Sequence, residues 1–168
     1  MILPFSTQLN GKPTYFVERI HKCFSLKEIY MIAGLDPSIH YPKDYNFVAK
    51  DRKQAKLHTI REDLKDRWRK GTMIDFFINC RQKDMFRFAP RISVISTQHV
   101  FMTYWGNDII QISVSGRELF GHNERLEFAI NDGFDTWEDF FNYFYPIIEK
   151  SKDKCFSGKV IHWTDLRY

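Results

Sequence analysis

The stretch Asp108-Ile109-Ile110-Gln111-Ile112-Ser113-Val114 alternates apolar and polar residues over most of its length. A period of two places successive side chains on opposite faces of a β-strand, so the stretch predicts a strand with one buried face. Residues 91–96 show a similar alternation, and residues 100–105 fit between the two as a further strand that ends at a Gly106-Asn107 turn. The middle of the chain therefore predicts neighbouring strands joined by short turns.

Further strands are expected on both sides of this region, at residues 2–9, 73–78, 125–130 and 159–163. A turn signal, Asn10-Gly11, follows the first of them. Several short strands at such a spacing favour an antiparallel sheet that curls or closes.

Three helices are also expected. Helical spacing of apolar residues predicts a helix over residues 13–23, with Pro13 in its first turn. A capping box of Ser25 and Glu28 and a stop at Gly34 predict a second, short helix, and residues 36–46 are expected to form a loop.

The third helix is expected to begin after Asp135, with Glu138 completing a capping box, and to bend or end near Tyr145 because Pro146 follows. Its apolar stripe predicts core packing, because aromatic residues that stack on bases must stay exposed. The residues of the stripe are Trp137, Phe140, Phe141, Phe144 and Ile148. Strands together with these helices predict one α+β domain.

Composition narrows the class of protein. The 168 residues, of which 43% are apolar, suffice for one domain with a substantial core. The six histidines and three cysteines show no local pairing typical of a metal site, and no glycine-rich phosphate loop occurs, so no metal and no cofactor are expected. No apolar run could cross a membrane, and no secretory signal is evident, so we expect a cytoplasmic protein.

Positive charge is concentrated in one segment. Residues 50–70 contain nine Lys or Arg against four acids, a net charge of +5, whereas the whole chain carries only +4. Such a local field indicates an anionic, nucleotide-like partner, although a solvated charged loop is the alternative. The cations expected to bind are Lys53, Arg61, Arg67, Arg69 and Lys70. Trp68, flanked by cations, is either a base-stacking residue or an anchor for the segment.

Within this segment, Lys56, Thr59 and Arg61 have the chemistry of an acyl-transfer site. A threonine hydroxyl needs a base to become a nucleophile, and a lysine amine supplies one when burial or a neighbouring cation disfavours its charged form. A guanidinium can stabilise the developing anion or bind a phosphate. The alternative is that Thr59 is a structural strand residue and the two cations bind phosphate or face water.

The pattern Lys56-x-x-Thr59-Ile60-Arg61, followed by Gly71 and an apolar strand, resembles the signature of the ASCH domains, a branch of the PUA-like superfamily. The resemblance extends to the opening residues 2–6, to the Asp132-Gly133-Phe134 turn with the helix that follows it, and to the closing strand. It implies a single domain over residues 1–168, built as a PUA-like curled antiparallel β-barrel with flanking helices. It also implies a cleft beside Lys56 to Arg61 that binds RNA or a modified nucleotide.

One bacterial branch of that family removes the acetyl group from N4-acetylcytidine with a lysine, a threonine and a glutamate. By position these residues correspond to Lys56, Thr59 and Asp132. The aspartate departs from the family pattern because its side chain is one methylene shorter, and a small misplacement of a catalytic group is costly. Glu124 and Glu127 are the alternative acids.

A second departure is an insertion at about residues 25–53, which is rich in tyrosine. It could cover the cleft, elaborate the packing or present a surface to a protein partner. Three functions therefore stay open: a domain that binds RNA or a modified nucleotide, an amidohydrolase acting on an N4-acylated cytidine, and a protein-interaction module.

Overall fold

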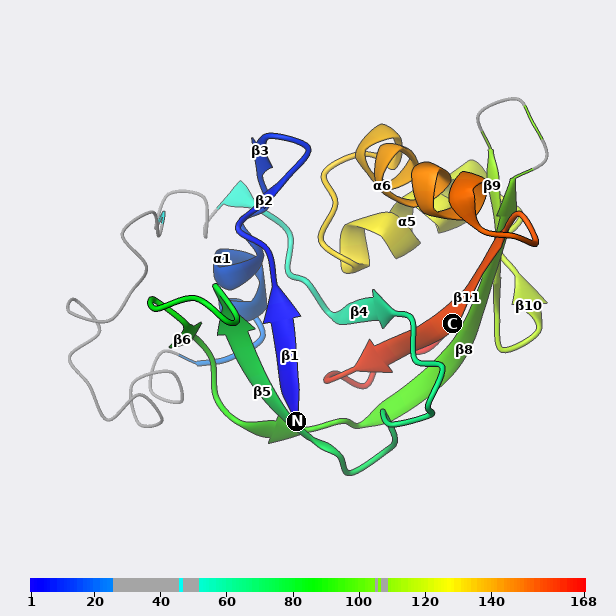
Figure 1. The fold of residues 1–168 in the computed structure, drawn as a ribbon. Helices are drawn as coiled ribbons and strands as arrows, with labels where there is room; N and C mark the ends of the chain where they lie inside the picture. Colours follow the sequence, from blue (N-terminus) through cyan, green and yellow to red (C-terminus); the bar gives the residue numbers. More distant parts are fainter. Residues whose placement is uncertain (26–45, 47–51, 105, 107–108) are drawn as a thin grey trace. The chain divides into compact units, whose positions relative to one another are not determined.

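The computed structural model of the chain describes residues 1–25, 46, 52–104, 106 and 109–168 (Figure 1). These residues form two compact units. The first unit comprises Met1–Lys56 and Thr72–Ser93, and the second comprises Leu57–Gly71 and Val94–Tyr168. Both contain strands and helices, so the predicted α+β class is confirmed.

The first unit is built on a four-stranded sheet. Its central strand is β5 (Met73–Ile78), which pairs with β1 (Ile2–Phe5), β6 (Phe86–Arg87) and β7 (Ile92–Ser93). Burial alternates along both long strands, and the inward residues Leu3, Phe5, Ile74, Phe76 and Ile78 form the core. The strand predicted over residues 73–78 is confirmed to the residue.

The pairing of β1 with β5 is parallel, which differs from the predicted antiparallel sheet. Parallel strands require a long crossover connection, and the chain between these two strands includes the helix α1 (Phe16–His21). A short hairpin precedes that helix: β2 (Gln8–Leu9) pairs with β3 (Lys12–Pro13) across the predicted turn. Asn10 and Gly11 both have positive φ there, as a tight hairpin turn requires.

Helix α1 begins later than predicted. Pro13 lies in β3 rather than in the first helical turn, since the hairpin uses the residues that would have begun the helix. All six residues of α1 are buried, including Glu18, Arg19 and His21.

The second unit is built on a five-stranded antiparallel sheet in the order β10-β9-β8-β11-β4. The strands are β4 (His58–Arg61), β8 (Ser96–Tyr104), β9 (Ile110–Val114), β10 (Arg117–Glu118) and β11 (Cys155–His162). The strands predicted at 100–105, 108–114 and 159–163 correspond to β8, β9 and β11 among the described residues. The first and the last of these strands begin earlier than predicted, and β9 begins at Ile110. Of the residues 91–96, only Ile92–Ser93 and Ser96 are in strands.

Helix α6 (Trp137–Lys150) packs on β8 and β11, and α5 (His122–Asn131) packs beside α6 (Figure 1). Phe140, Phe144 and Ile148 are almost completely buried, so core packing of the predicted stripe is confirmed. Their contacts include Phe128 of α5 and Phe156 of β11.

Both ends of α6 differ in detail from the prediction. The N-cap is Thr136 rather than Asp135, because the Thr136 hydroxyl accepts the Asp139 N–H at 3.1 Å. The helix also continues through Pro146 to Lys150. Pro146 leaves the Asn142 carbonyl without its helical partner, and Asn142 is exposed, so water can satisfy it.

The predicted strand at residues 125–130 is wrong, because these residues belong to helix α5. Leu126, Phe128 and Ile130 alternate with other residues, but the buried positions are Phe128, Ala129 and Asn131, which follow helical spacing. The position of Asp132 depends on this helix, as described below.

The described strands form separate sheets of five, four and two strands and do not close into one barrel. Most of the predicted insertion at 25–53, with its helix and loop, lies outside the described residues. In the part of the chain that the structure describes, no helix is long and apolar enough to cross a membrane.

Candidate functional site

Thr59 and Arg61 lie on β4, at the edge of the five-stranded sheet. In register with β11, Arg61 pairs with Lys159 and Thr59 pairs with Ile161. Thr59 is 1% exposed, whereas Arg61 is half-buried. A Cβ atom at Gly158 would lie 2.6 Å from the Arg61 carbonyl oxygen, so only glycine allows β11 to approach β4 this closely.

Asp132 is placed by the end of helix α5, where it is the C-cap residue. Gly133 follows with a φ of 92°, the left-handed conformation in which helices commonly end. Asp132 is 4% exposed, and its Oδ1 accepts the backbone N–H of Ile60 at 3.2 Å. The carboxylate is therefore fixed against the backbone of β4 at Ile60, the residue between Thr59 and Arg61.

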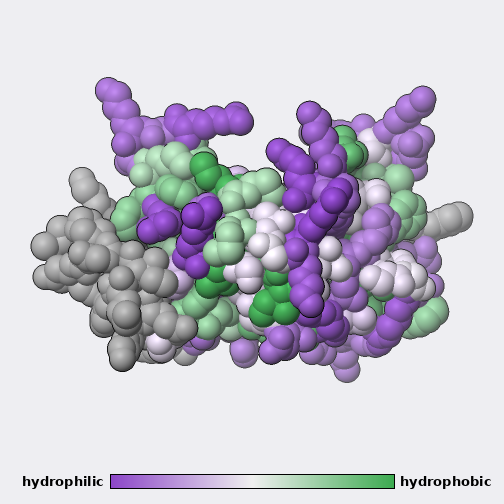
Figure 2. Space-filling view, turned by 90° about the horizontal axis from the view of Figure 1, so that it is seen from below, coloured by the Kyte–Doolittle hydropathy of each residue, from purple (hydrophilic) through white to green (hydrophobic). Residues whose placement is uncertain are grey.

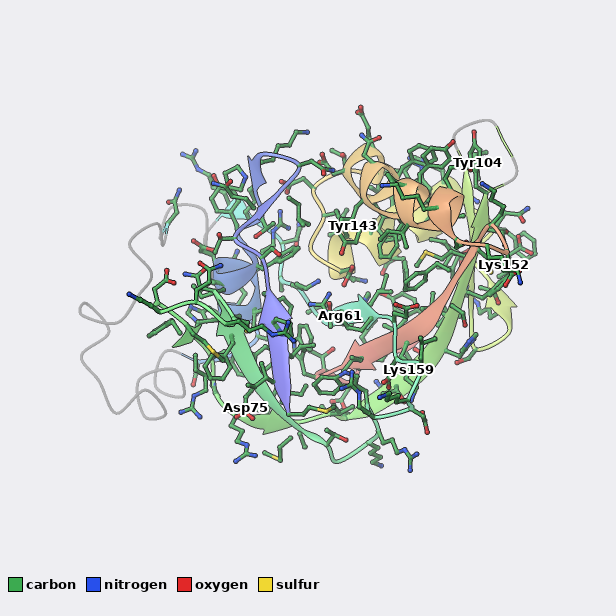
Figure 3. The ribbon with its side chains drawn as sticks, in the orientation of Figure 1. Arg61, Asp75, Tyr104, Tyr143, Lys152 and Lys159 are labelled. Carbon is green, nitrogen blue, oxygen red and sulfur yellow. The ribbon has the colours of Figure 1, made fainter. Side chains whose placement is uncertain are left out.

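Asp132 and Tyr143 of α6 both interact electrostatically with the Arg61 guanidinium. Figure 3 labels Arg61 on β4 and Tyr143 on α6. We call these three residues the arginine cluster. Burial lowers the pKa of Arg61 from its ordinary value, and the Asp132 carboxylate opposes that effect. Burial raises the pKa of the Tyr143 phenol. The charge of Arg61 lowers this pKa, and the charge of Asp132 raises it further. The cluster thus combines a partly desolvated cation, a carboxylate and a neutral phenol that can donate or accept a hydrogen bond.

A second set of polar groups lies behind Asp132. The Nδ1 atom of His58 is 3.7 Å from Asp132 Oδ1, and its Nε2 is hydrogen-bonded to the Tyr168 hydroxyl at 2.7 Å. Asn131 donates to the same hydroxyl at 3.0 Å. This network ties β4 to the end of α5 and to Tyr168, so it supports the position of Asp132.

Lys56 belongs to the first unit, at the point where the chain passes into the second. It is 1% exposed, with its Nζ 4.6 Å from the centre of the Phe16 ring, and its backbone N–H donates to Arg19 O at 3.2 Å. Lys56 is therefore a buried residue and not a solvated surface lysine. Exposure of its side chain to bulk solvent would argue against a catalytic role, and the structure does not show such exposure.

Arg61 leads into residues 62–71, which we call the basic loop. Asp63 organises its first part by accepting the N–H groups of Trp68, at 2.8 Å, and Arg67, at 3.0 Å. Burial raises the pKa of the Asp63 carboxyl, but these two bonds and the Lys159 ammonium outweigh it, so the pKa is lowered overall. Lys159 of β11 also donates to Trp68 O at 2.8 Å and pairs with Asp66.

The cationic side chains of the basic loop are exposed, although Asp63 and Lys159 hold the backbone of the loop in place. Arg67 and Arg69 are exposed and pair with Asp63 and Asp66, and Lys70 is exposed. Hydrophilic side chains gather over the connection between β4 and β5 in Figure 2. Trp68 is 5% exposed, which favours the anchoring interpretation of this residue over base stacking.

Other predicted residues lie apart from this cluster. Lys53 belongs to the first unit, where its Nζ lies 5.1 Å from the centre of the Tyr15 ring. Glu124 forms an exposed ion pair with Arg117, and Glu127 is exposed on α5. Among the described residues, no group of three or more His, Cys, Asp or Glu could hold a metal ion.

Sequence reasoning missed Tyr143, His58, Asn131 and Tyr168. Tyr143 has no distinguishing pattern, since it lies beside the apolar stripe of α6 and is identified only by the fold. The sequence signal for the geometry around Asp132 is Gly133, which predicts a turn and which in the structure terminates helix α5.

The chain was compared with protein-family models, with curated proteins and with solved structures, and none of the three comparisons gives a match.

Proposed function

We propose that this chain binds RNA or a modified nucleotide through the arginine cluster and the basic loop. The observation that carries the proposal is the placement of Arg61. It is half-buried beside Asp132 and Tyr143, and the chain continues from it into a loop that is braced internally and exposes its cations.

The two parts have complementary chemistry. A partly desolvated guanidinium with a carboxylate and a phenol offers donors and acceptors at close range, which suits the edge of a base or a ribose. Exposed Arg and Lys side chains on a braced loop suit phosphates, which supply most of the affinity in nucleic-acid binding. A PUA-like relationship of the ASCH kind remains part of this proposal, resting on the motif that begins at Lys56.

The test uses the full chain and a labelled oligoribonucleotide in fluorescence anisotropy. We expect binding at about 50 mM salt that weakens as salt rises, because bound phosphates release counterions. Arg67→Gln combined with Lys70→Gln should reduce the salt slope by about 1.4, since each of the two lost contacts to a single strand removes about 0.7.

The matched control is Lys150→Gln combined with Lys152→Gln, which removes the same charge from exposed positions at and just beyond the end of α6. This variant should bind as the unmodified chain does. Absence of RNA binding at about 50 mM salt, where counterion release favours it, would rule the proposal out.

A second candidate is the amidohydrolase, and two observations favour it. Thr59 and Asp132 lie in the same unit, and the Asp132 carboxylate is fixed by the N–H of Ile60, the residue after Thr59. In this reaction the Thr59 oxygen would attack the acyl carbonyl while a base takes its proton, a role that the ASCH resemblance assigns to Lys56. Cytidine would leave with a proton, and water would hydrolyse the acyl ester. The binding function has the better support, because a buried hydroxyl is less accessible to a substrate than the half-buried Arg61.

The amidohydrolase predicts that N4-acetylcytidine is converted to cytidine, as followed by chromatography. Thr59→Ala should abolish the conversion, whereas Thr59→Ser, which keeps a hydroxyl, should retain a measurable part of it. No conversion by the unmodified chain, or conversion that persists in Thr59→Ala, would exclude this function without affecting the binding proposal.

A further inference from the structure

One face of the five-stranded sheet is not covered by α5 and α6, and we call it the open face. Burial alternates along β9, along β8 from His99 to Met102 and along β11 as far as Val160: Val100, Met102, Ile112 and Val160 are fully buried, whereas the residues between them on each strand are exposed or half-buried. The open face ends towards β4, where Ile161 and its register partner Thr59 are buried. Directly paired residues of antiparallel strands share a face. The strand register therefore places on the open face His99, Phe101, Gln111, Ser113, Ser157 and Lys159.

Phe101 lies in the middle of this face and is 40% exposed. Its direct neighbours in register are Ser157 on β11 and Ser113 on β9, both small side chains that leave an aromatic ring accessible. His99, two residues earlier on the same strand face, is exposed and hydrogen-bonded through Nε2 to Ser157 Oγ at 3.0 Å. A large ring surrounded by small polar residues has the composition of a stacking surface.

The basic loop is attached to this same face. Lys159 is the direct neighbour of His99 in register, and its Nζ holds the loop through Trp68 O. The exposed cations of the loop are thereby tied to the β11 side of the open face. On the other side, Glu118 of β10 pairs in register with Ser113. Positive charge and the exposed aromatic ring thus coincide on the β8–β11 half of the sheet.

The geometry points to single-stranded RNA as the ligand of this face, with a base stacked on Phe101 and the adjoining phosphates bound by Arg67 and Lys70. A stacking residue needs a base whose face is accessible, which a single strand offers and a duplex does not. The exposed cations match the charge of the phosphate backbone. This inference rests on the proposed binding of RNA by the basic loop, and it specifies the form of the RNA and a stacking residue outside the arginine cluster.

The experiment compares Phe101→Ala with the unmodified chain by fluorescence anisotropy, using an unstructured oligoribonucleotide of about twelve nucleotides and the same sequence as a duplex. We expect Phe101→Ala to weaken binding of the single strand about tenfold, without changing the salt slope, because stacking involves no counterion release. Phe101→Trp should retain the affinity. The unmodified chain should bind the single strand more tightly than the duplex.

The matched control is Phe120→Ala, which removes an aromatic side chain that is 74% exposed and lies beyond β10, at the opposite edge of the sheet. It should bind RNA normally, and thermal unfolding checks that both alanine variants are folded. If the loop variant Arg67→Gln with Lys70→Gln weakens binding but Phe101→Ala does not, the inference is overturned and the proposed function stands. Equal binding of duplex and single strand also overturns it, and a lack of any RNA binding removes the proposed function as well.

Discussion

Replacement of Asp132 by alanine is expected to lower the free energy of unfolding of the second unit by about 3 kcal/mol. Asp132 accepts the buried N–H of Ile60 and is the counter-ion of the partly desolvated Arg61. The substitution leaves the N–H without its acceptor and the guanidinium without its carboxylate, and both effects destabilise the folded state. Because Arg61 is half-buried, the cost should lie at the lower end of that for a broken buried pair.

Urea denaturation followed by circular dichroism measures this loss. Asp132→Asn should cost less, because its amide oxygen can still accept the Ile60 N–H while the charge is removed. The control is Glu149→Ala, whose carboxylate is 49% exposed and pairs with Lys154 at the surface, and which should change stability by less than about 1 kcal/mol. If Asp132→Ala costs no more than this control, Asp132 does not hold β4 as the structure indicates.

The stability of the second unit is expected to fall by about 3 kcal/mol as the pH is lowered from 7 to 4, through His162 alone. His162 is fully buried, and burial, followed by the charge of Arg167, lowers its pKa from 6.5 to about 4. Between these two pH values the unfolded chain binds a proton that the folded chain does not. The contribution of His162 is therefore complete above pH 6.5, declines as the pH falls and is lost near pH 4.

The described neighbours of His162 include two further rings and a serine. Its ring lies 5.4 Å from that of His58 and 6.1 Å from that of Tyr168, and its register partner on β8 is Ser96. Denaturation curves at several pH values should show a shallower pH dependence for His162→Gln than for the unmodified chain. His122→Gln, at an exposed position, is the control and should leave the pH dependence unchanged. Parallel curves for His162→Gln and the unmodified chain would contradict the assignment.

The strands and the main helix could be predicted because their patterns are local. Residues 73–78 and 110–114 alternate in burial as their sequence does, and the stripe from Phe140 to Ile148 follows one helical face. In these elements the side chains that pack against the core are identified by spacing alone, so no knowledge of distant contacts was needed.

Helix α5 could not be predicted from apolar spacing. Only Phe128 and Ala129 of its apolar residues are buried, which is too few for a helical stripe, and the alternation of Leu126, Phe128 and Ile130 suggested a strand. The parallel pairing of β1 with β5 was also inaccessible, since it joins segments about seventy residues apart in the sequence.

The candidate site was predicted in part. Thr59, Arg61 and Asp132 were singled out from the sequence, and the structure brings Arg61 and Asp132 together in the second unit. Tyr143 was not singled out, because a tyrosine next to an apolar stripe has no distinguishing signal until α6 is packed on the sheet. Trp68 was considered for stacking because of its flanking cations, but its burial depends on Asp63 and Lys159, which only the fold brings together.

The most direct test of the central claim is a titration of the ¹⁵N-labelled chain with a single-stranded oligoribonucleotide, followed by NMR of the backbone amides. The account predicts chemical-shift changes at residues 59–61, at Asp132 and Gly133, and along the basic loop. Changes confined to residues outside the second unit, or none at about 50 mM salt, would contradict it.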